Sequence, residues 1–230
     1  MTVSGMEAGM GGLRIVIFGA TGMIGQGALR ECVRDSGVDS VLAVVRTPLP
    51  DGMPKLTQVE HRDFTDFSSV TNEFADSDGC FYCLGVSSVG MSEADYTRVT
   101  YDYGTAANAA FQQASPNGRF LFVSGVGSDA DSSTMWRKVK GRSENAILEA
   151  NPNGFVFRPG AVMPRDGIRS RTGWVNGFYT VTAPLRPLLL RALPGQVNHT
   201  RRIGRAMLAV TRDGYSQRIL SARDINIVAS

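Results

Sequence analysis

The feature that most constrains how this chain can fold is the stretch LRIVIFGATGMIGQGALREC, which begins at Leu13. An apolar run leads directly into three glycines at three-residue spacing, Gly19, Gly22 and Gly25, and an amphipathic segment follows. A strand that passes through such a turn into a helix is typical of a dinucleotide site. A glycine triplet alone is weak evidence in a chain with 26 glycines, so its position between strand and helix carries the argument. The alternative is a turn that only packs the helix close to the sheet.

The three glycines have different expected roles. Gly19 permits the tight bend, Gly22 lets a pyrophosphate approach the main chain, and Gly25 lets the helix pack closely on the strand. The first amides of the helix would point at phosphate oxygens, where the helix dipole also favours negative charge. The residues of this turn expected to bind a dinucleotide are Gly19, Thr21, Gly22, Met23, Ile24 and Gly25.

Apolar runs alternate with helix-length segments over most of the chain. Six strands are expected, at 13–18, 40–45, 57–61, 80–85, 119–124 and 154–157. Amphipathic stretches between them lie at 23–35, 66–75, 93–114 and 134–150. Several strands are almost entirely apolar, as expected when helices cover both faces of a parallel sheet. The alternation predicts an α/β fold with a doubly wound, Rossmann-type parallel sheet that binds ligands at the carboxyl ends of its strands.

The pattern changes after Arg158. Five prolines between 159 and 194 disfavour long regular elements. The stretch TRRIGRAMLAVTRDG has apolar residues at helical spacing, and Gly214 is placed to end the helix. Ser221 and Asp224 form a capping-box variant that would open a last short helix.

One domain is expected over residues 13–228, with 1–12 as a flexible leader and 159–228 as a small irregular lobe that faces the substrate or a partner. The start lacks a basic region followed by an apolar one, so no secretory signal is expected. The apolar stretch 174–185 is too short to span a bilayer. Three cysteines cannot all pair with one another, and the expected location is the cytoplasm.

Charge is unevenly distributed along the chain. Residues 158–230 carry 12 arginines, no lysine and three acidic residues, whereas residues 1–157 carry 12 basic and 18 acidic residues. Such asymmetry suggests that the C-terminal part faces a phosphate, a carboxylate, an acidic partner or a membrane surface. The favoured alternative is a set of solvated arginines, because no run exceeds two. Nucleic acid is not an expected partner, since aromatic residues do not interleave with the arginines.

Further cofactor residues are expected after the other strands. Arg46 ends the second strand, where enzymes that select NAD usually have an acidic residue, and its guanidinium suits a 2′-phosphate. This favours NADP(H) over NAD(H), unless Arg46 simply stays in solvent. Asp63 follows the third strand and could accept from the adenine amino group, with Phe64 beside it, or it could cap the next turn. Three residues that end the fourth strand would lie under the ribose and nicotinamide: Leu84, Gly85 and Val86.

Several of these motifs resemble the atypical branch of the short-chain dehydrogenase/reductase superfamily: the GATGxxG turn, the Asp63-Phe64 pair, Ser124 at the end of a strand, and RPG at 158–160. More narrowly, VKGRSENAI, RPG and GRAMLAV…ILSARDI are similar to the Tat-interacting-protein oxidoreductase-like proteins and their bacterial relatives. The resemblance covers residues 13–228. It implies an NAD(P)-binding fold and an oxidoreductase or NAD-dependent epimerase-like function.

The resemblance also implies three catalytic positions. A serine after the fifth strand hydrogen-bonds the reacting oxygen, a tyrosine transfers the proton, and a lysine four residues later binds the nicotinamide ribose. Carried onto this chain, the serine is Ser124, with Ser128 as the alternative, the lysine is Lys140, and the tyrosine position holds Trp136. An indole can donate a hydrogen bond but is not a usable acid or base. Its presence would slow the proton-transfer step by about two to four decades.

Another tyrosine could supply the proton, and the candidates are Tyr82, Tyr96, Tyr101 and Tyr103. Core or interface packing is the commoner use of such residues. Two functions therefore stay open. One is an enzyme that acts on a small or amphipathic metabolite by hydride transfer, and the other is a non-catalytic, NADP(H)-responsive regulator that binds a partner. A homodimer through the helices at 93–114 and 134–150 is expected by analogy only.

Other signals are discounted. Cys80 and Cys83 are three apart in an expected strand, so their thiols should point to opposite faces and serve as packing. His61 and His199 lack metal-ligand spacing, so no metal site is expected. The apolar stretch 174–195 is expected to form a pocket wall with arginines at its rim, which would suit a substrate with an anionic head and an apolar body.

Overall fold

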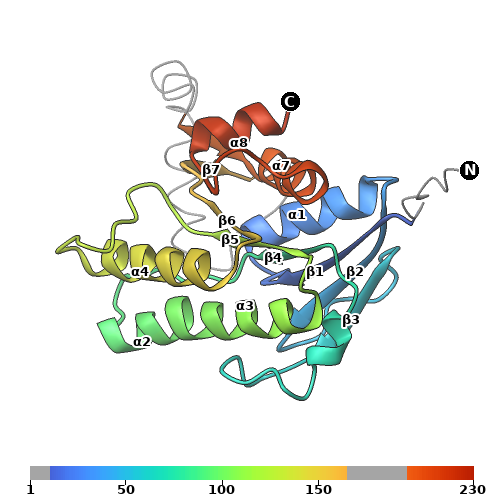
Figure 1. Ribbon diagram of the computed structural model, residues 1–230, viewed down its shortest axis with the longest axis horizontal. Helices are drawn as coiled ribbons and strands as arrows, with labels where there is room; N and C mark the ends of the chain where they lie inside the picture. Colours follow the sequence, from blue (N-terminus) through green and yellow to red (C-terminus); the bar gives the residue numbers. More distant parts are fainter. Residues whose placement is uncertain (1–10, 165–195) are drawn as a thin grey trace, which may run out of the picture.

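The computed structural model describes residues 11–164 and 196–230. Its main element is a sheet of seven parallel strands in the order β3-β2-β1-β4-β5-β6-β9 (Figure 1). The strands are β1 (Leu13–Phe18), β2 (Val38–Val45), β3 (Leu56–Glu60), β4 (Gly79–Tyr82), β5 (Arg119–Val123), β6 (Gly154–Phe157) and β9 (Ile219–Leu220). The strand order reverses between β1 and β4, where open α/β sheets bind their ligands. The predicted α/β fold with a doubly wound parallel sheet is confirmed.

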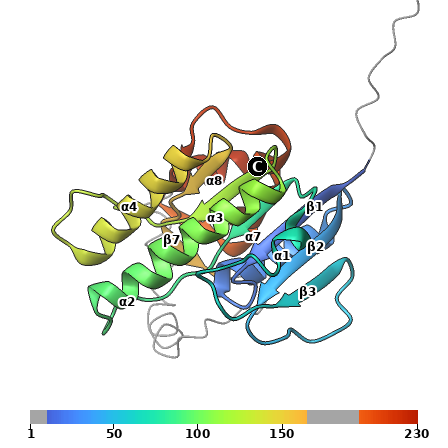
Figure 2. The ribbon, with the colours of Figure 1, turned by 60° about the horizontal axis from the view of Figure 1, so that its bottom comes forward.

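Helices cover both faces of the sheet (Figures 1 and 2). On one face lie α1 (Met23–Arg34), α7 (Thr200–Asp213) and α8 (Ala222–Val228). On the other lie α2 (Glu93–Thr97), a π-helical turn (Arg98–Asp102), α3 (Tyr103–Ala114) and α4 (Met135–Ala150). The side chains of β1 alternate between the two cores, with Ile15 and Ile17 in the first and Val16 and Phe18 in the second. Because both faces are buried, the whole strand is apolar.

The two cysteines of CFYC follow the same alternation. Cys80 belongs to the core beneath α3 and α4, whereas Cys83 packs against the core beneath α1 and α7. Both thiols are free, and burial raises the pKa of each, that of Cys83 to about 12. The prediction that they serve as packing residues and not as a redox pair is confirmed.

The prediction of a helix at 66–75 is wrong over most of that range. Only a short 3₁₀ helix, η1 (Thr71–Phe74), forms there. The carboxylate of Asp63 accepts from the amide of Thr65, at 2.9 Å, and that of Asp66 accepts from the amide of Ser68, at 2.8 Å. These side-chain hydrogen bonds stabilise turns that compete with a helix.

The C-terminal elements agree in part with expectation. α7 ends at Gly214, whose φ of 73° permits the turn, and Ser221 and Asp224 form the predicted capping box at the start of α8. Three short strands were not predicted: β9 and the parallel pair β7 (Ala161–Met163) and β8 (Val197–His199). Runs of two or three residues are too short to show an apolar period.

Two segments considered in the sequence have no counterpart among the described residues. Residues 1–10 of the expected leader and the apolar stretch 174–195 lie outside the described residues. Within 11–164 and 196–230, no helix combines the length and apolar content needed to cross a membrane.

Candidate functional site

The glycine turn after β1 has the expected conformation. Gly19 has a φ of +75°, and a Cβ there would lie 2.7 Å from the amide nitrogen of Leu84, just after β4. At Gly25 a Cβ would lie only 2.1 Å from the carbonyl oxygen of Gly19. The tight bend expected at Gly19 and the close helix packing expected at Gly25 are therefore both present.

α1 begins directly at this turn. Gly22 is its N-cap residue, and no side chain of the described residues caps the helix. The first turn also contains no acidic residue, so the amides of Met23 and Ile24 keep the positive end of the helix dipole uncompensated. A pyrophosphate could accept hydrogen bonds from these amides.

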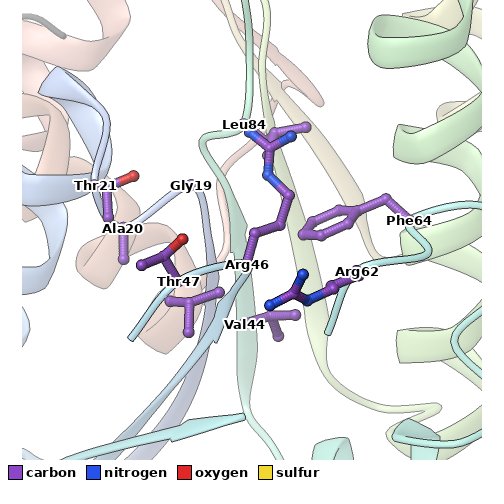
Figure 3. A pocket seen from close by; sticks show the side chains of 10 residues that line it. Gly19, Ala20, Thr21, Val44, Arg46, Thr47, Arg62, Phe64 and Leu84 are labelled. Carbon is purple, nitrogen blue, oxygen red and sulfur yellow. The ribbon is translucent and has the colours of Figure 1, made fainter. Parts of the chain in front are cut away.

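A cavity of about 430 Å³ opens beside the turn, at the carboxyl ends of neighbouring strands. Its lining comes from the glycine turn, β2 and the residues that follow β2, β3 and β4: Gly19, Ala20, Thr21, Val44, Val45, Arg46, Thr47, Arg62, Phe64 and Leu84 (Figure 3). Five of these were expected to bind a dinucleotide: Gly19, Thr21, Arg46, Phe64 and Leu84. The fold thus brings residues from four separate segments to one cavity.

Arg46 is exposed and makes no hydrogen bond or ion pair with the part of the chain that the structure describes. Figure 3 shows its side chain extending past Phe64 toward Leu84. A guanidinium with no competing acceptor can form two parallel hydrogen bonds to a phosphate. The position therefore suits the expected 2′-phosphate contact.

Asp63 follows β3 and stands next to Phe64 of the cavity lining. Its Oδ1 accepts from the amide and the hydroxyl of Thr65, at 2.9 and 2.5 Å, and these hydrogen bonds lower the pKa of the carboxyl. The residue caps the next turn, as the alternative interpretation had it, and does not line the cavity. Gly85 and Val86 are exposed and also lie outside the cavity lining. Arg62, which the sequence did not single out, lines it instead.

The two candidate serines form one pair after β5. The Ser124 and Ser128 hydroxyl oxygens lie 2.9 Å apart, and the Ser128 hydroxyl also donates to the carbonyl oxygen of Gly125, at 2.8 Å. Both serines are buried. Since Ser128 donates to Gly125, it can accept from Ser124 at the same time, so the two positions act as one hydrogen-bonded unit.

Lys140 is partly buried on α4. Burial lowers its pKa to about 8, and the charge of Glu144, one helical turn away, opposes part of that shift. Glu144 is itself fully buried and accepts from Arg158, whose Nε lies 3.1 and 3.0 Å from the two carboxylate oxygens. Glu144 and Arg158 were not expected to act at the site, although the spacing of four between Lys140 and Glu144 places them on one helix face.

Trp136 lies in the first turn of α4 and is partly buried. It makes no hydrogen bond or ring contact with the described residues. The indole therefore has no polar partner there that would give it a role in proton transfer.

The four tyrosines considered as substitutes lie in different surroundings. Tyr82 and Tyr96 are buried, and burial raises the pKa of both phenols. The Tyr101 ring lies under the guanidinium of Arg142, 5.5 Å away. The Tyr103 ring lies 5.8 Å from that of Phe64, beside the cavity. A raised pKa makes a phenol a poorer proton donor at neutral pH, which disfavours the two buried tyrosines.

Comparison with solved structures supports the same fold. A short-chain dehydrogenase from Burkholderia cenocepacia in complex with NADP superposes with a TM-score of 0.63 at 18% identity, covering 94% of this chain and 92% of that one. Uronate dehydrogenase from Agrobacterium tumefaciens superposes with a TM-score of 0.66 at 15% identity, covering 91% of this chain and 76% of that one. A thiolation-reductase di-domain from an archaeal non-ribosomal peptide synthetase superposes with a TM-score of 0.67 at 14% identity, covering 93% of this chain and 71% of that one. The chain shares the Rossmann fold of these structures.

Curated sequences match the chain over only part of its length, and no family model matches the chain. Protein FMP52, mitochondrial, of Debaryomyces hansenii is 27% identical over 154 residues, or 64% of this chain and 66% of that protein. The protein of the same name from Candida albicans is 27% identical over 153 residues, with the same coverage. Leucinostatins biosynthesis cluster protein T of Purpureocillium lilacinum is 23% identical over 137 residues, or 58% and 51%. The chain thus matches two thirds or less of the length of these relatives.

The expected cytoplasmic location is overturned by these relatives. Four of the five are named as mitochondrial proteins. The expectation depended on free cysteines and the lack of a secretory signal, and both features oppose only an oxidising, secretory route. They cannot discriminate between one reducing compartment and another.

Proposed function

We propose that the protein binds NADP(H) at the turn after β1 and the adjoining cavity. The observation that carries this proposal is a helix start at Met23 beside a cavity of about 430 Å³ that contains Arg46. Among the described residues, no side chain caps the helix and Arg46 has no polar partner. The amides of α1 would hold the pyrophosphate, Phe64 would contact the adenosine half, and Leu84 would lie under the ribose and nicotinamide. Arg46 supports NADP(H) over NAD(H), because an arginine pairs with a 2′-phosphate and an acidic residue would pair with the ribose hydroxyl.

The proposed activity is that of an oxidoreductase or epimerase-like enzyme on a small or amphipathic metabolite. The coenzyme, when bound, supplies or accepts a hydride. The Ser124 hydroxyl would turn from Ser128 to donate its hydrogen bond to the reacting oxygen of the substrate, while Ser128 stays bonded to Gly125. Lys140 would hold the ribose through its ammonium group. The proposed substrate class, a small or amphipathic metabolite, rests on the fold and on the resemblance of the catalytic positions.

We further infer that Lys140 replaces the missing tyrosine as proton donor. Its pKa of about 8 lies close to neutral pH, whereas burial moves the phenols of Tyr82 and Tyr96 away from it. A general acid is most effective when its pKa lies near the operating pH. Glu144 and Arg158 would act as positioning residues, since their ion pair holds α4 against the end of β6.

A second candidate function is a non-catalytic, NADP(H)-responsive regulator. The observation that favours it is Trp136, which occupies the tyrosine position and has no polar partner among the described residues. In this case Lys140 would still hold the ribose, because that role needs only a charged amine with donors. The C-terminal lobe would then present a surface to a partner chain.

Two measurements test these proposals. Calorimetric titration of the purified protein with NADPH and NADH should give binding of both, with NADPH tighter; no heat with either would refute the cofactor site. NADPH consumption is then followed across a panel of carbonyl compounds for the wild type, Lys140→Met and Trp136→Tyr. Turnover by the wild type that Lys140→Met abolishes supports the enzyme, and turnover only in Trp136→Tyr supports the regulator.

A further inference from the structure

Two arginines reach the same cavity from neighbouring strands. Arg46 directly follows β2, and Arg62 comes two residues after β3, whose last residue Glu60 pairs with Val45 in the sheet. Both arginines line the cavity beside the glycine turn. Figure 3 shows the two side chains in the lining, with the side chain of Arg46 extending toward Leu84 and the guanidinium of Arg62 apart from its tip.

Arg62 is held in place along one edge of its guanidinium. Its Nε and Nη2 donate to the same carboxylate oxygen of Glu60, at 3.1 and 2.8 Å. The third nitrogen, Nη1, has no hydrogen-bond partner among the described residues. The side chain of Arg62 is 81% exposed, so nothing in the described structure shields that nitrogen from a ligand. Glu60 thus limits the freedom of Arg62 while leaving one donor edge available.

Arg46 and Arg62 carry more positive charge than the adenosine half of NAD(H) would need. A 2′-phosphate carries about −1.5 to −2 charges at neutral pH and three acceptor oxygens. Arg46 alone balances only part of that charge. Arg46 and Arg62, partly offset by Glu60, together with the Thr47 hydroxyl in the same lining, provide donors from more than one direction.

We propose that Arg62 is a second ligand of the 2′-phosphate of NADP(H) and that Glu60 is its positioning residue. The inference rests on the proposed cofactor site and adds a specificity-determining residue to it. Arg62 approaches from the end of β3 and Arg46 from the end of β2, so the phosphate would be held between two strands. A coenzyme without the 2′-phosphate would leave Arg46 without an anionic partner among the described residues and Arg62 with Glu60 alone.

The test measures binding of two fragments that differ only in the 2′-phosphate, 2′,5′-ADP and 5′-ADP, by calorimetry. Arg62→Ala should lower the affinity for 2′,5′-ADP about tenfold, as expected for a lost charged hydrogen bond, and change that for 5′-ADP less than twofold. The matched control is Arg98→Ala. Arg98 is also an exposed arginine in an ion pair, with Asp95, but it does not line the cavity. Thermal unfolding of each variant confirms that it is folded.

The outcomes separate this inference from the proposed function. A selective loss of 2′,5′-ADP binding in Arg62→Ala, absent from Arg98→Ala, supports the second ligand. Equal losses for both fragments, or no loss for either, would overturn it while the wild type still binds NADPH. If the wild type binds neither fragment nor either coenzyme, the cofactor site itself fails.

Discussion

Glu144 of α4 and Arg158 after β6 form an ion pair that joins the helix carrying Lys140 to the carboxyl end of the sheet. The Glu144 carboxylate is fully buried, whereas the Arg158 side chain is 30% exposed. Neither residue belongs to the serine, tyrosine and lysine positions that the family resemblance implies. The pair nevertheless ties α4 to the residue that follows β6, one helical turn along from Lys140.

The first prediction concerns this pair. Glu144→Gln removes the charge that compensates Arg158, and removing one partner of a buried pair leaves the other without compensation. Because Arg158 is partly exposed, we expect a loss below the roughly 3–5 kcal/mol of a fully buried pair, about 2 kcal/mol in the free energy of unfolding. Urea denaturation measures it. Glu149→Gln, an exposed acid on the same helix, serves as the control and should change stability by less than about 0.5 kcal/mol.

The second prediction follows from the lowered pKa of Lys140, about 8 in the folded protein against 10.5 for an ordinary lysine. Between these two pH values the unfolded chain binds more protons than the folded one, so stability rises with pH in this window. Lys140→Met removes this dependence. The free energy of unfolding of the wild type, relative to that of the variant, should therefore increase from pH 8 to pH 10. Lys138→Met, on the same helix but in a surface pair with Glu93, provides the comparison. An identical pH trend in wild type and Lys140→Met would contradict the assigned pKa.

The third prediction concerns the glycine turn. Gly25→Ala would place a methyl group 2.1 Å from the carbonyl oxygen of Gly19, so the helix must move away from the turn. We expect a loss of about 1–3 kcal/mol in the free energy of unfolding and weaker binding of NADPH. At Gly85 an added Cβ meets no atom within 4 Å, so Gly85→Ala should leave stability within about 0.5 kcal/mol of the wild type. Calorimetry and urea denaturation of both variants make the comparison, and equal effects at the two positions would contradict it.

The fourth prediction is a pH dependence of coenzyme selectivity. The second pKa of a phosphate monoester is about 6, so below that pH the 2′-phosphate loses one negative charge. The ratio of NADPH to NADH affinity should fall as pH drops from 7.5 to 5.5, because a protonated phosphate forms weaker charge-assisted hydrogen bonds with the two guanidinium groups. Binding titrations of both coenzymes at four pH values measure the ratio. A ratio that stays constant over this range would indicate that the phosphate is not held by charge.

Much of the fold was open to prediction from local pattern. The strand, glycine turn and helix at 13–34 are encoded within 22 consecutive residues, and the alternating burial of β1 follows from its apolar run. The end of α7 and the start of α8 also depend on local chemistry. Gly214 ends α7 with its positive φ, and the capping box of Ser221 begins α8. Such features need no distant partner, so they can be inferred from neighbouring residues.

Other features depend on contacts between distant residues. Arg62, which lines the cavity, was not singled out from the sequence, because nothing local distinguishes it from the other arginines. Arg46 and Arg62 are separated by 16 positions, and only the pairing of β2 with β3 makes them neighbours. Glu144 meets Arg158 for a similar reason, since α4 packs back on β6. Sequence thus determined the elements and the glycine turn, because these depend on backbone conformation and apolar period. The tertiary structure decided which charged side chains share a cavity or a buried pair, because desolvation and Coulomb interactions depend on distances that the order of residues does not specify.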